Sequence, residues 1–270
     1  MLIATFNCNS IRSRLGIVLD WLAEHRPDVL ALQETKCVDE QFPAEAFAQA
    51  GWRVVYRGQK AYNGVALVSR DELADVSFGL GDDAGDSGPR LARGRLGDVT
   101  VLNTYVPQGF EIGSEKFQFK LEWFGRLRRY LESHFDPARD KLVWVGDLNV
   151  APEAKDVYDP KGIWPHVCYC RQAIDALASV VSWGLEDVFR KHLPGEGIYT
   201  FWDYRLPMAA QSNLGWRLDH VWATAPAAAG SREAFVDVEP RMAEKPSDHT
   251  FVAARFGWGR EGKKVIGHSS

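Results

Sequence analysis

One stretch of the sequence sets the strongest constraint on the fold. Residues 142–145 form an apolar run that ends abruptly at Gly146, and Asp147 and Asn149 follow it. This pattern predicts a buried strand that presents a carboxylate and a carboxamide at its end. Alternate side chains of an extended chain point the same way. Asp147 and Asn149 are therefore expected to project together at the mouth of a sheet.

Other apolar runs carry polar residues at their ends in the same way. The run 1–6 leads to Asn7 and Asn9, 29–32 leads to Glu34, and 99–102 leads to Tyr105. Near the leading ends of two later strand candidates, 216–223 and 250–256, stand Asp219 and the pair Asp248-His249. If the later strands run opposite to the earlier ones, as a mixed sheet allows, all these side chains meet at one edge.

Helical patterns alternate with these strands over the whole chain. Residues 11–22 show one apolar helical face before Pro27, a helix with Ser114 as its N-cap follows the run at 99–102, and 171–183 form a helix that ends at Gly184. Further strands are predicted at 52–57 and 63–69, with an exposed loop at 79–90. The alternation predicts one α/β domain over residues 1–258, with sheets packed between helices, followed by a flexible tail at 259–270.

Composition narrows the possible partners. A net charge of −4 over 270 residues argues against a protein that coats nucleic acid by bulk attraction. A polyanionic substrate would need a local basic surface, for which the usual alternative is a solvated face. The basic residues available for it are Arg53, Arg57, Lys60, Arg90, Arg93, Lys116 and Lys120.

The termini, the apolar runs and the cysteines bear on the compartment. No apolar run is long enough to cross a bilayer, and the amino terminus does not have the pattern of a signal peptide. The four cysteines include one C-x-C and no C-x-x-C, so neither a zinc ribbon nor a disulfide framework is indicated. The simplest interpretation is a reducing, cytoplasmic location.

The polar residues at the strand ends suit hydrolysis of a phosphate ester. Glu34 is a natural ligand for Mg²⁺, which needs only one or two protein carboxylates beside substrate oxygens. Asp147 could accept a proton from an attacking water, with Asn149 as a neutral donor to the phosphoryl oxygens. His249 as an imidazolium would oppose the charge on the phosphate, and Asp219 would keep it protonated.

Each of these residues also has a purely structural interpretation. Asn7 and Asn9 could close a turn, and Asp219 could form a surface pair with Arg217. A lone histidine such as His249 is more often half-buried than catalytic, and Trp202 and Trp216 are individually more typical of a core. The structural interpretation has to be invoked separately for every position, which weakens it.

Seven motifs, in order, resemble those of the exonuclease III family of apurinic/apyrimidinic endonucleases, a branch of the endonuclease/exonuclease/phosphatase superfamily. They are Phe6-Asn7-Cys8-Asn9, Leu32-Gln33-Glu34-Thr35-Lys36, residues 103–109 (NTYVPQG), 146–151 (GDLNVA), 199–205 (YTFWDYR), 215–219 (GWRLD) and Ser247-Asp248-His249.

The resemblance implies a fold, an activity and partners. The fold would be a four-layered α/β sandwich in which two mixed β-sheets pack face to face and helices flank them. The activity would depend on Mg²⁺, with Mn²⁺ as a plausible substitute. It would comprise incision of DNA 5′ to abasic sites together with 3′→5′ exonuclease, 3′-phosphatase and 3′-phosphodiesterase action. The substrate would be duplex DNA with abasic sites, nicks or blocked 3′ ends, and a monomer acting away from membranes is expected.

The resemblance also implies roles for particular residues. The implied metal site contains Glu34, Asn7 and Asp248, where Asp248 serves the metal or the leaving group. The implied catalytic residues are Tyr105, Asp147, Asn149, Asp219, Asp248 and His249. The implied DNA-binding residues are Asn9, Gln108, Arg90, Lys116, Trp202 and the apolar pocket of Phe201, Trp216 and Leu218, which would receive a base-less sugar.

Two departures from the family pattern stand out. Asn9 occupies a position where some members carry an acidic residue, and Val167-Cys168-Tyr169-Cys170-Arg171 replaces the usual Glu-Arg entry to a helix. The neighbouring His166 would lie beside the sugar pocket, and our hypothesis is that it shifts preference from internal abasic sites to 3′ termini. Two other functions stay open: a related phosphatase acting on phosphoinositides, sphingomyelin or nucleotides, and a non-catalytic binder of damaged DNA.

Overall fold

Most strands of this protein are buried on both faces. The structure is a computed structural model, and it describes residues 1–82 and 88–258. In β8 (Lys141–Asp147), Leu142 and Trp144 face a layer of helices, whereas Val143 and Val145 face a second sheet. A strand that is covered on both faces must be apolar throughout, and this explains the continuous runs in the sequence.

The first sheet has six strands in the order β11-β12-β1-β2-β4-β3. Within it β1 runs parallel to β2, and the other neighbours are antiparallel. Its strands are β1 (Leu2–Asn7), β2 (Val29–Gln33), β3 (Arg53–Arg57), β4 (Val65–Ser69), β11 (Ser231–Asp237) and β12 (Phe251–Phe256).

The second sheet also has six strands, in the order β5-β6-β7-β8-β10-β9. Here β7 runs parallel to β8, and the other neighbours are antiparallel. Its other strands are β5 (Ala74–Phe78), β6 (Leu91–Leu96), β7 (Val99–Tyr105), β9 (Leu185–Asp187) and β10 (Asp219–Thr224).

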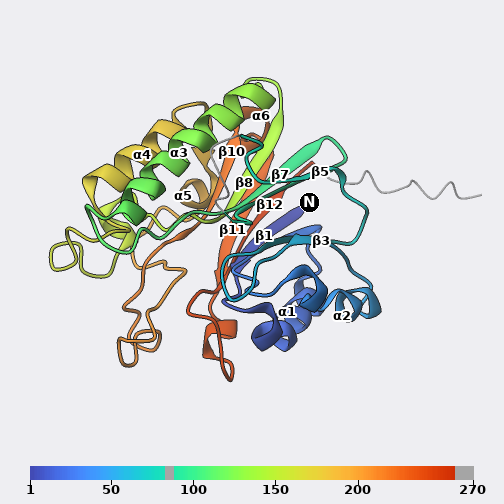
Figure 1. Ribbon diagram of the computed structural model, residues 1–270, viewed down its shortest axis with the longest axis horizontal. Helices are drawn as coiled ribbons and strands as arrows, with labels where there is room; N and C mark the ends of the chain where they lie inside the picture. The colour runs from blue at the N-terminus through green and yellow to red at the C-terminus, as the bar shows by residue number, and fades with distance from the viewer. Residues whose placement is uncertain (83–87, 259–270) are drawn as a thin grey trace, which may run out of the picture.

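Helices cover the outer face of each sheet, which gives four layers (Figure 1). The first sheet packs on α1 (Ile11–His25) and α2 (Ala44–Gln49), and the second on α3 (Glu115–His134) and α4 (Arg171–Val181). Two short helices, α5 (Val188–His192) and α6 (Ala225–Ala228), follow β9 and β10. The amino end of α3 is capped as predicted, because the Ser114 side chain accepts a hydrogen bond from the amide of Phe117 at 3.2 Å.

The structure confirms the predicted sandwich of two mixed sheets between helices. The sequence patterns missed three antiparallel strands, β5, β9 and β11, for a physical reason. Each lies at an edge of its sheet and is either very short, as β9 is, or carries several exposed side chains, so it lacks a strong apolar signal. The predicted tail at 259–270 and part of the 79–90 loop lie outside the described residues. Among the described helices, none has the length and apolarity needed to span a membrane.

Candidate active site

The polar residues predicted at the strand ends meet where the two sheets adjoin. Asn7, Tyr105 and Asp147 are the last residues of β1, β7 and β8, and Glu34 directly follows β2. Asp219 opens β10, which runs antiparallel to β8 so that Asp219 lies opposite Asp147 in register. The antiparallel pairing of β1 with β12 brings the segment 247–249 to the same edge. The mixed topology therefore brings the polar residues of early and late strands to one edge, as the sequence pattern predicted.

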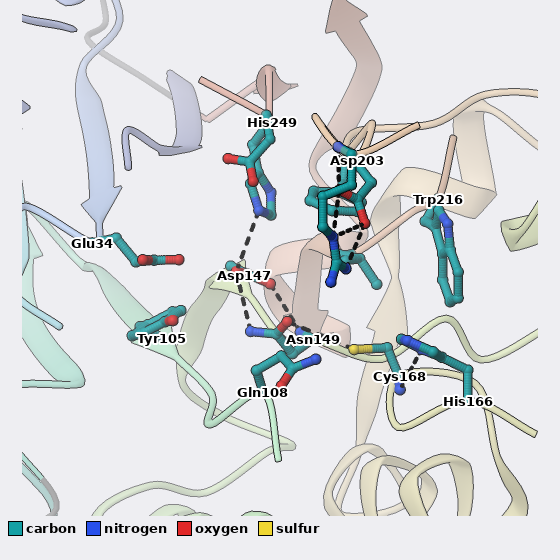
Figure 2. A pocket seen from close by; sticks show the side chains of 14 residues that line it. Glu34, Tyr105, Gln108, Asp147, Asn149, His166, Cys168, Asp203, Trp216 and His249 are labelled. Atoms are coloured by element: carbon teal, nitrogen blue, oxygen red, sulfur yellow. Dashed lines mark hydrogen bonds and ion pairs between the residues drawn. The ribbon is translucent and has the colours of Figure 1, made fainter. Parts of the chain in front are cut away.

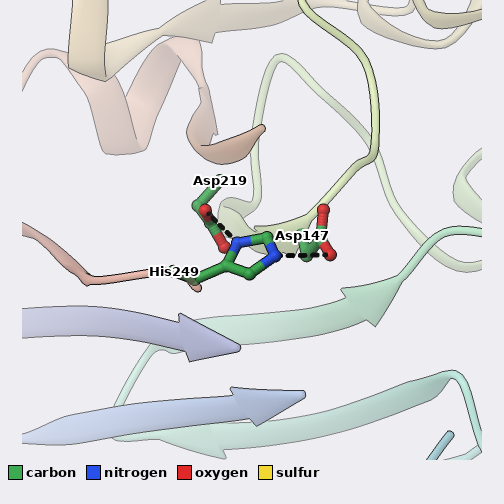
Figure 3. A group of neighbouring side chains, drawn as sticks. All are labelled: Asp147, Asp219 and His249. Carbon is green, nitrogen blue, oxygen red and sulfur yellow. Dashed lines mark hydrogen bonds and ion pairs between the residues drawn. The ribbon is translucent and has the colours of Figure 1, made fainter. Parts of the chain in front are cut away.

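His249 lies between two buried carboxylates (Figure 3). Its Nδ1 is 2.8 Å from Asp219 Oδ2, and its Nε2 is 3.7 Å from Asp147 Oδ2. Burial lowers the pKa of His249, but the charges of Asp219 and Asp147 outweigh it and raise the pKa to about 10. The ring is therefore an imidazolium at neutral pH, as predicted from the pairing with an acidic neighbour.

Asp147 is 1% exposed and is held from several sides. Its Oδ2 accepts a hydrogen bond from Asn7 Nδ2 at 2.8 Å, and its Oδ1 accepts one from the Asn149 amide at 2.9 Å. Burial raises the pKa of Asp147 to about 7, with Asp219 and Glu34 adding to the rise while His249 and Asn7 oppose it. A carboxylate with a pKa near 7 is well matched to accept a proton at neutral pH.

The side-chain N–H groups of Asn149 are hydrogen-bonded within the protein. Its Nδ2 donates to the Val106 carbonyl at 3.0 Å and to Asp147 Oδ2 at 3.2 Å. The Cys168 thiol lies 3.8 Å from its Oδ1. Without substrate, both N–H groups of Asn149 are engaged in holding Asp147 and its loop, and the expected role of Asn149 as a neutral donor to phosphoryl oxygens stays a prediction.

Glu34 lies on the other side of the pocket, with a backbone φ of +50°. Its Oε1 accepts a hydrogen bond from Asn7 Nδ2 at 2.8 Å, and its Oε2 is 2.7 Å from Lys36 Nζ. Burial raises the pKa of Glu34, but Lys36 and Asn7 reverse this and hold it below the ordinary range. Asn7 orients both Glu34 and Asp147, and its own Oδ1 accepts the amide of Asn9.

The donor set suits a hard divalent cation. Glu34, Asp147 and Asp248 all line one pocket, and each offers carboxylate oxygens, which Mg²⁺ prefers. Asp248 is held by Asn9, whose Nδ2 donates to its Oδ1 at 2.9 Å. Ligand atoms of Asp147, Asp219 and His249 also lie within 4.8 Å of one another, but His249 bridges those two carboxylates as an ion pair. The side of the pocket with Glu34 and Asp248 is the better place for the ion.

The pocket is a cavity of about 220 Å³ with a charged side and an apolar side (Figure 2). Phe201, Trp216 and Leu218 form the apolar wall, as predicted from the resemblance. The His166 ring lies 4.7 Å from the Trp216 ring, so the imidazole narrows that side. The remaining lining residues are Glu34, Tyr105, Gln108, Asp147, Asn149, Cys168, Asp203, Arg205, Asp248 and His249.

The other residues expected to bind DNA have mixed outcomes. Arg90 stacks over the ring of Tyr105 at 4.8 Å, and Lys116 is exposed over the ring of Phe110 at 5.1 Å. Trp202 is a correction, because it is 2% exposed in a separate cluster with Tyr199 and does not line the pocket.

Two charged residues also differ from expectation. Lys120 is fully buried and cannot grip a DNA backbone. Arg217 is likewise buried and pairs with Asp156 at 2.7 Å and Asp187 at 2.9 Å, so it forms no surface pair with Asp219.

Several residues in and beside the pocket were not among the predicted site residues. Lys36 pairs with Glu34, and Asp203 forms an ion pair with Arg205 at 2.6 Å on the pocket lining. Cys168 lines the same cavity. The motifs containing Lys36, Asp203 and Arg205 were visible in the sequence, but only the fold shows which of their side chains turn toward the pocket.

Two packed sheets between helices, with buried carboxylates and an imidazolium at their shared edge, fit a phosphodiester hydrolase of the four-layered nuclease class. Comparison with known proteins agrees. The chain belongs to the endonuclease/exonuclease/phosphatase family, which it matches over residues 4–249, and within it to the exonuclease III/AP endonuclease branch.

Three similar proteins illustrate this membership. Exodeoxyribonuclease III of Haemophilus influenzae is 32% identical over 93% of this chain and 98% of its own length. An AP endonuclease structure from Archaeoglobus fulgidus is 48% identical with a TM-score of 0.92, covering 96% of this chain and 100% of that one. The 3′ phosphatase NExo from Neisseria, bound to a product DNA hairpin, is 38% identical with a TM-score of 0.91 over the same shares.

Proposed function

We propose that this protein is a Mg²⁺-dependent DNA-repair nuclease that incises DNA 5′ to abasic sites and removes nucleotides and blocking groups from 3′ ends. The observation that carries the proposal is a cavity of about 220 Å³ with Asp147 and His249, the partner of Asp219, on its charged side and an apolar wall of Phe201, Trp216 and Leu218 opposite. Such a pocket suits a deoxyribose without its base better than a bulky headgroup. The names of the similar proteins support DNA as the substrate.

In this proposal each side chain has a defined task. Asp147 takes a proton from the attacking water, because it is buried, ionised near neutrality and fixed by Asn7 and Asn149. The imidazolium of His249 opposes the negative charge that builds on the phosphate, and Asp219 keeps it protonated. Burial, together with Glu34 and Asp147, raises the pKa of Tyr105 well above its ordinary value, so its hydroxyl stays neutral and can donate a hydrogen bond to the phosphate.

A divalent cation would be held by Glu34 and Asp248, and it would supply positive charge to the phosphate oxygens. Lys36 and Asn9 act on this site through those two carboxylates, since Lys36 pairs with Glu34 and Asn9 donates to Asp248. No reaction step needs an activated serine or cysteine. Burial raises the pKa of Cys168, the thiol on the pocket lining, to about 11 and makes it a poor nucleophile at neutral pH.

The test uses a labelled duplex with one stable abasic analogue and a nicked duplex with a 3′-phosphate. The wild-type protein should cleave both with Mg²⁺ or Mn²⁺ and neither with EDTA. Asp147→Asn should lower the rate by at least about 100-fold, whereas Asp20→Asn, the same change at an exposed position of α1, should not. Cleavage of phosphoinositide or sphingomyelin instead of DNA, or DNA binding without any cleavage, would contradict the proposal.

The position of His166 favours a second candidate function, a nuclease and phosphatase that prefers 3′ ends and incises abasic sites weakly. Its ring packs on Trp216 within the pocket and takes space that an extrahelical sugar would need. Burial, Lys120 and Arg205 lower the pKa of His166, so the ring is neutral at pH 7 and acts by its bulk.

Replacing His166 by glycine should raise incision of the abasic duplex relative to release of 3′-phosphate. The measurement is the ratio of the two rates, taken with the same enzyme preparation. His192→Gly, at a histidine outside the pocket, serves as the matched control. An unchanged ratio in His166→Gly would remove this candidate.

A further inference from the structure

Lys120 on α3 is a lysine with no exposed surface, and it forms none of the ion pairs found in the described part of the chain. Its ammonium group donates three hydrogen bonds, all to backbone carbonyls. The acceptors are the carbonyl oxygens of Gln108 at 3.1 Å, Asn149 at 2.7 Å and Val167 at 2.8 Å. Every donor of the ammonium group is thus satisfied by main chain.

The three carbonyls belong to three different loops around the pocket. Gln108 follows β7, and Asn149 follows β8. Val167 lies between His166 and Cys168. The side chains of Gln108, Asn149, His166 and Cys168 all line the pocket, so each loop that Lys120 holds also contributes to the pocket wall.

The packing around the lysine leaves little freedom. At Gly109, which has a φ of +99°, an added Cβ would lie 2.8 Å from Val167 Cγ2 and 3.2 Å from Lys120 Cδ. The loop at 105–110 therefore closes directly onto the lysine stem and onto the 166–170 loop. A shift of any one loop would change its contacts with both of the others.

A role in stability alone does not explain this arrangement well. Burying a lone ammonium carries a desolvation penalty, and an apolar side chain of similar volume is often neutral or better for stability. Burial lowers the pKa of Lys120, while Cys168, Cys170 and Asp147 oppose this. An apolar side chain such as methionine has no N–H donors. The ammonium group, in contrast, holds three separate carbonyls at one position.

We propose that Lys120 is a positioning residue, whose ammonium group sets the spacing of the three loops that carry Gln108, Asn149 and His166 into the pocket. This inference rests on the proposed nuclease function and deepens it. Lys120 touches neither the reacting atoms nor the solvent. It acts through the loops, and a displacement of about 1 Å in an active site is enough to cost about 100-fold in rate.

The first test compares Lys120→Met, which keeps the volume and loses the donors, with Lys120→Arg, which keeps a cationic donor. Arg129→Met, an exposed position on the same helix, is matched for loss of charge. Per folded molecule, kcat on the 3′-phosphate duplex should fall about 100-fold in Lys120→Met with KM changed only a few-fold. Lys120→Arg should recover at least part of the loss, and Arg129→Met should match the wild type.

Hydrogen exchange gives a readout that does not depend on activity. In Lys120→Met the segments 105–110, 147–151 and 166–170 should exchange faster together, and the strands of the first sheet should not. If Lys120→Met does not fold, Lys120→Gln, which retains an amide donor, is measured in the same way. Exchange that is unchanged in these three segments would overturn the inference.

A double-mutant cycle with Gln108→Ala separates positioning from general damage. If Lys120 acts by placing Gln108, Gln108→Ala should lower kcat much less in the Lys120→Met background than in the wild type. Additive losses, or a kcat of Lys120→Met within twofold of the wild type, would refute the positioning role. A wild-type protein that cleaves no DNA would instead refute the proposed function, so the two failures are distinguishable.

Discussion

The Asp219–His249 pair gives a prediction with a calculable pH dependence. Asp219→Asn removes the charge that most strongly raises the pKa of His249, but it keeps an oxygen that can accept the Nδ1 hydrogen bond. In the wild type this pKa is about 10. In the variant burial still lowers it and Asp147 still raises it, so we take its ordinary value of about 6.5.

The two values fix the size of the effect. At pH 8 nearly all of His249 is protonated in the wild type, against about 3% in the variant, which is a loss of about 30-fold. At pH 6 about three quarters of His249 is protonated in the variant, and the loss is less than about twofold. Asp219 also contributes to the raised pKa of Asp147, so its removal favours the ionised base and works against any loss at pH 6.

The assay is the single-turnover rate on the 3′-phosphate duplex at saturating Mg²⁺, at pH 6 and pH 8. The quantity of interest is the ratio of variant to wild type at each pH. Asp175→Asn, the same chemical change on the exposed face of α4, should give a ratio near one at both. A loss in Asp219→Asn that is the same at pH 6 and pH 8 would refute the view that Asp219 acts by keeping His249 charged.

Two further predictions concern the metal site and stability. Glu34→Gln should raise the Mg²⁺ or Mn²⁺ concentration needed for half-maximal cleavage. Mn²⁺ binding measured by calorimetry should weaken in parallel. Metal titration curves that are the same for the variant and the wild type would exclude Glu34 as a ligand. Asp156→Asn should destabilise the fold by about 3–5 kcal/mol in urea at pH 7, because it leaves buried Arg217 and Arg190 short of a counter-charge. Burial raises the pKa of Asp156 but Arg217 and Arg190 hold it below the ordinary value, so the difference should be full above about pH 4 and should shrink as pH falls through the lowered pKa. A deficit that persists unchanged in acid would contradict this account.

The sequence predicted the architecture well where burial is two-sided. Runs such as 142–145 can be interpreted because a strand between a helix layer and another sheet has no polar face, and the following polar residue marks where that burial ends. The edge strands β5 and β11 have no continuous apolar run that would reveal them in the sequence. Their place is set by hydrogen bonding to a neighbour that lies beyond the reach of local pattern.

The sequence predicted which residues form the site better than it predicted what their side chains contact. Asp147, His249 and Asp219 meet as expected, since their positions at strand ends constrain them once the strands pair. The contacts of individual side chains were harder to predict from the sequence. Trp202 and Trp216 both lie in aromatic-rich motifs, yet one packs in a separate cluster and the other lines the pocket. Lys120 and Lys116 are one helical turn apart, yet one is buried and the other exposed.

Cations with fixed partners reconcile the proposed polyanionic substrate with a net charge of −4. His249 is fixed by Asp219, Lys36 by Glu34, and Lys120 by three carbonyls, so each of these three positive groups already has a set place. Fixed charges need no reorganisation when the substrate arrives, which is the condition under which electrostatic stabilisation is most effective. An internal abasic site and an unblocked 3′-terminal nucleotide are both joined through a phosphodiester of the same charge, so charge alone cannot discriminate between these two substrates. Selectivity between them must come from the shape of the apolar side, where His166 stands against Trp216.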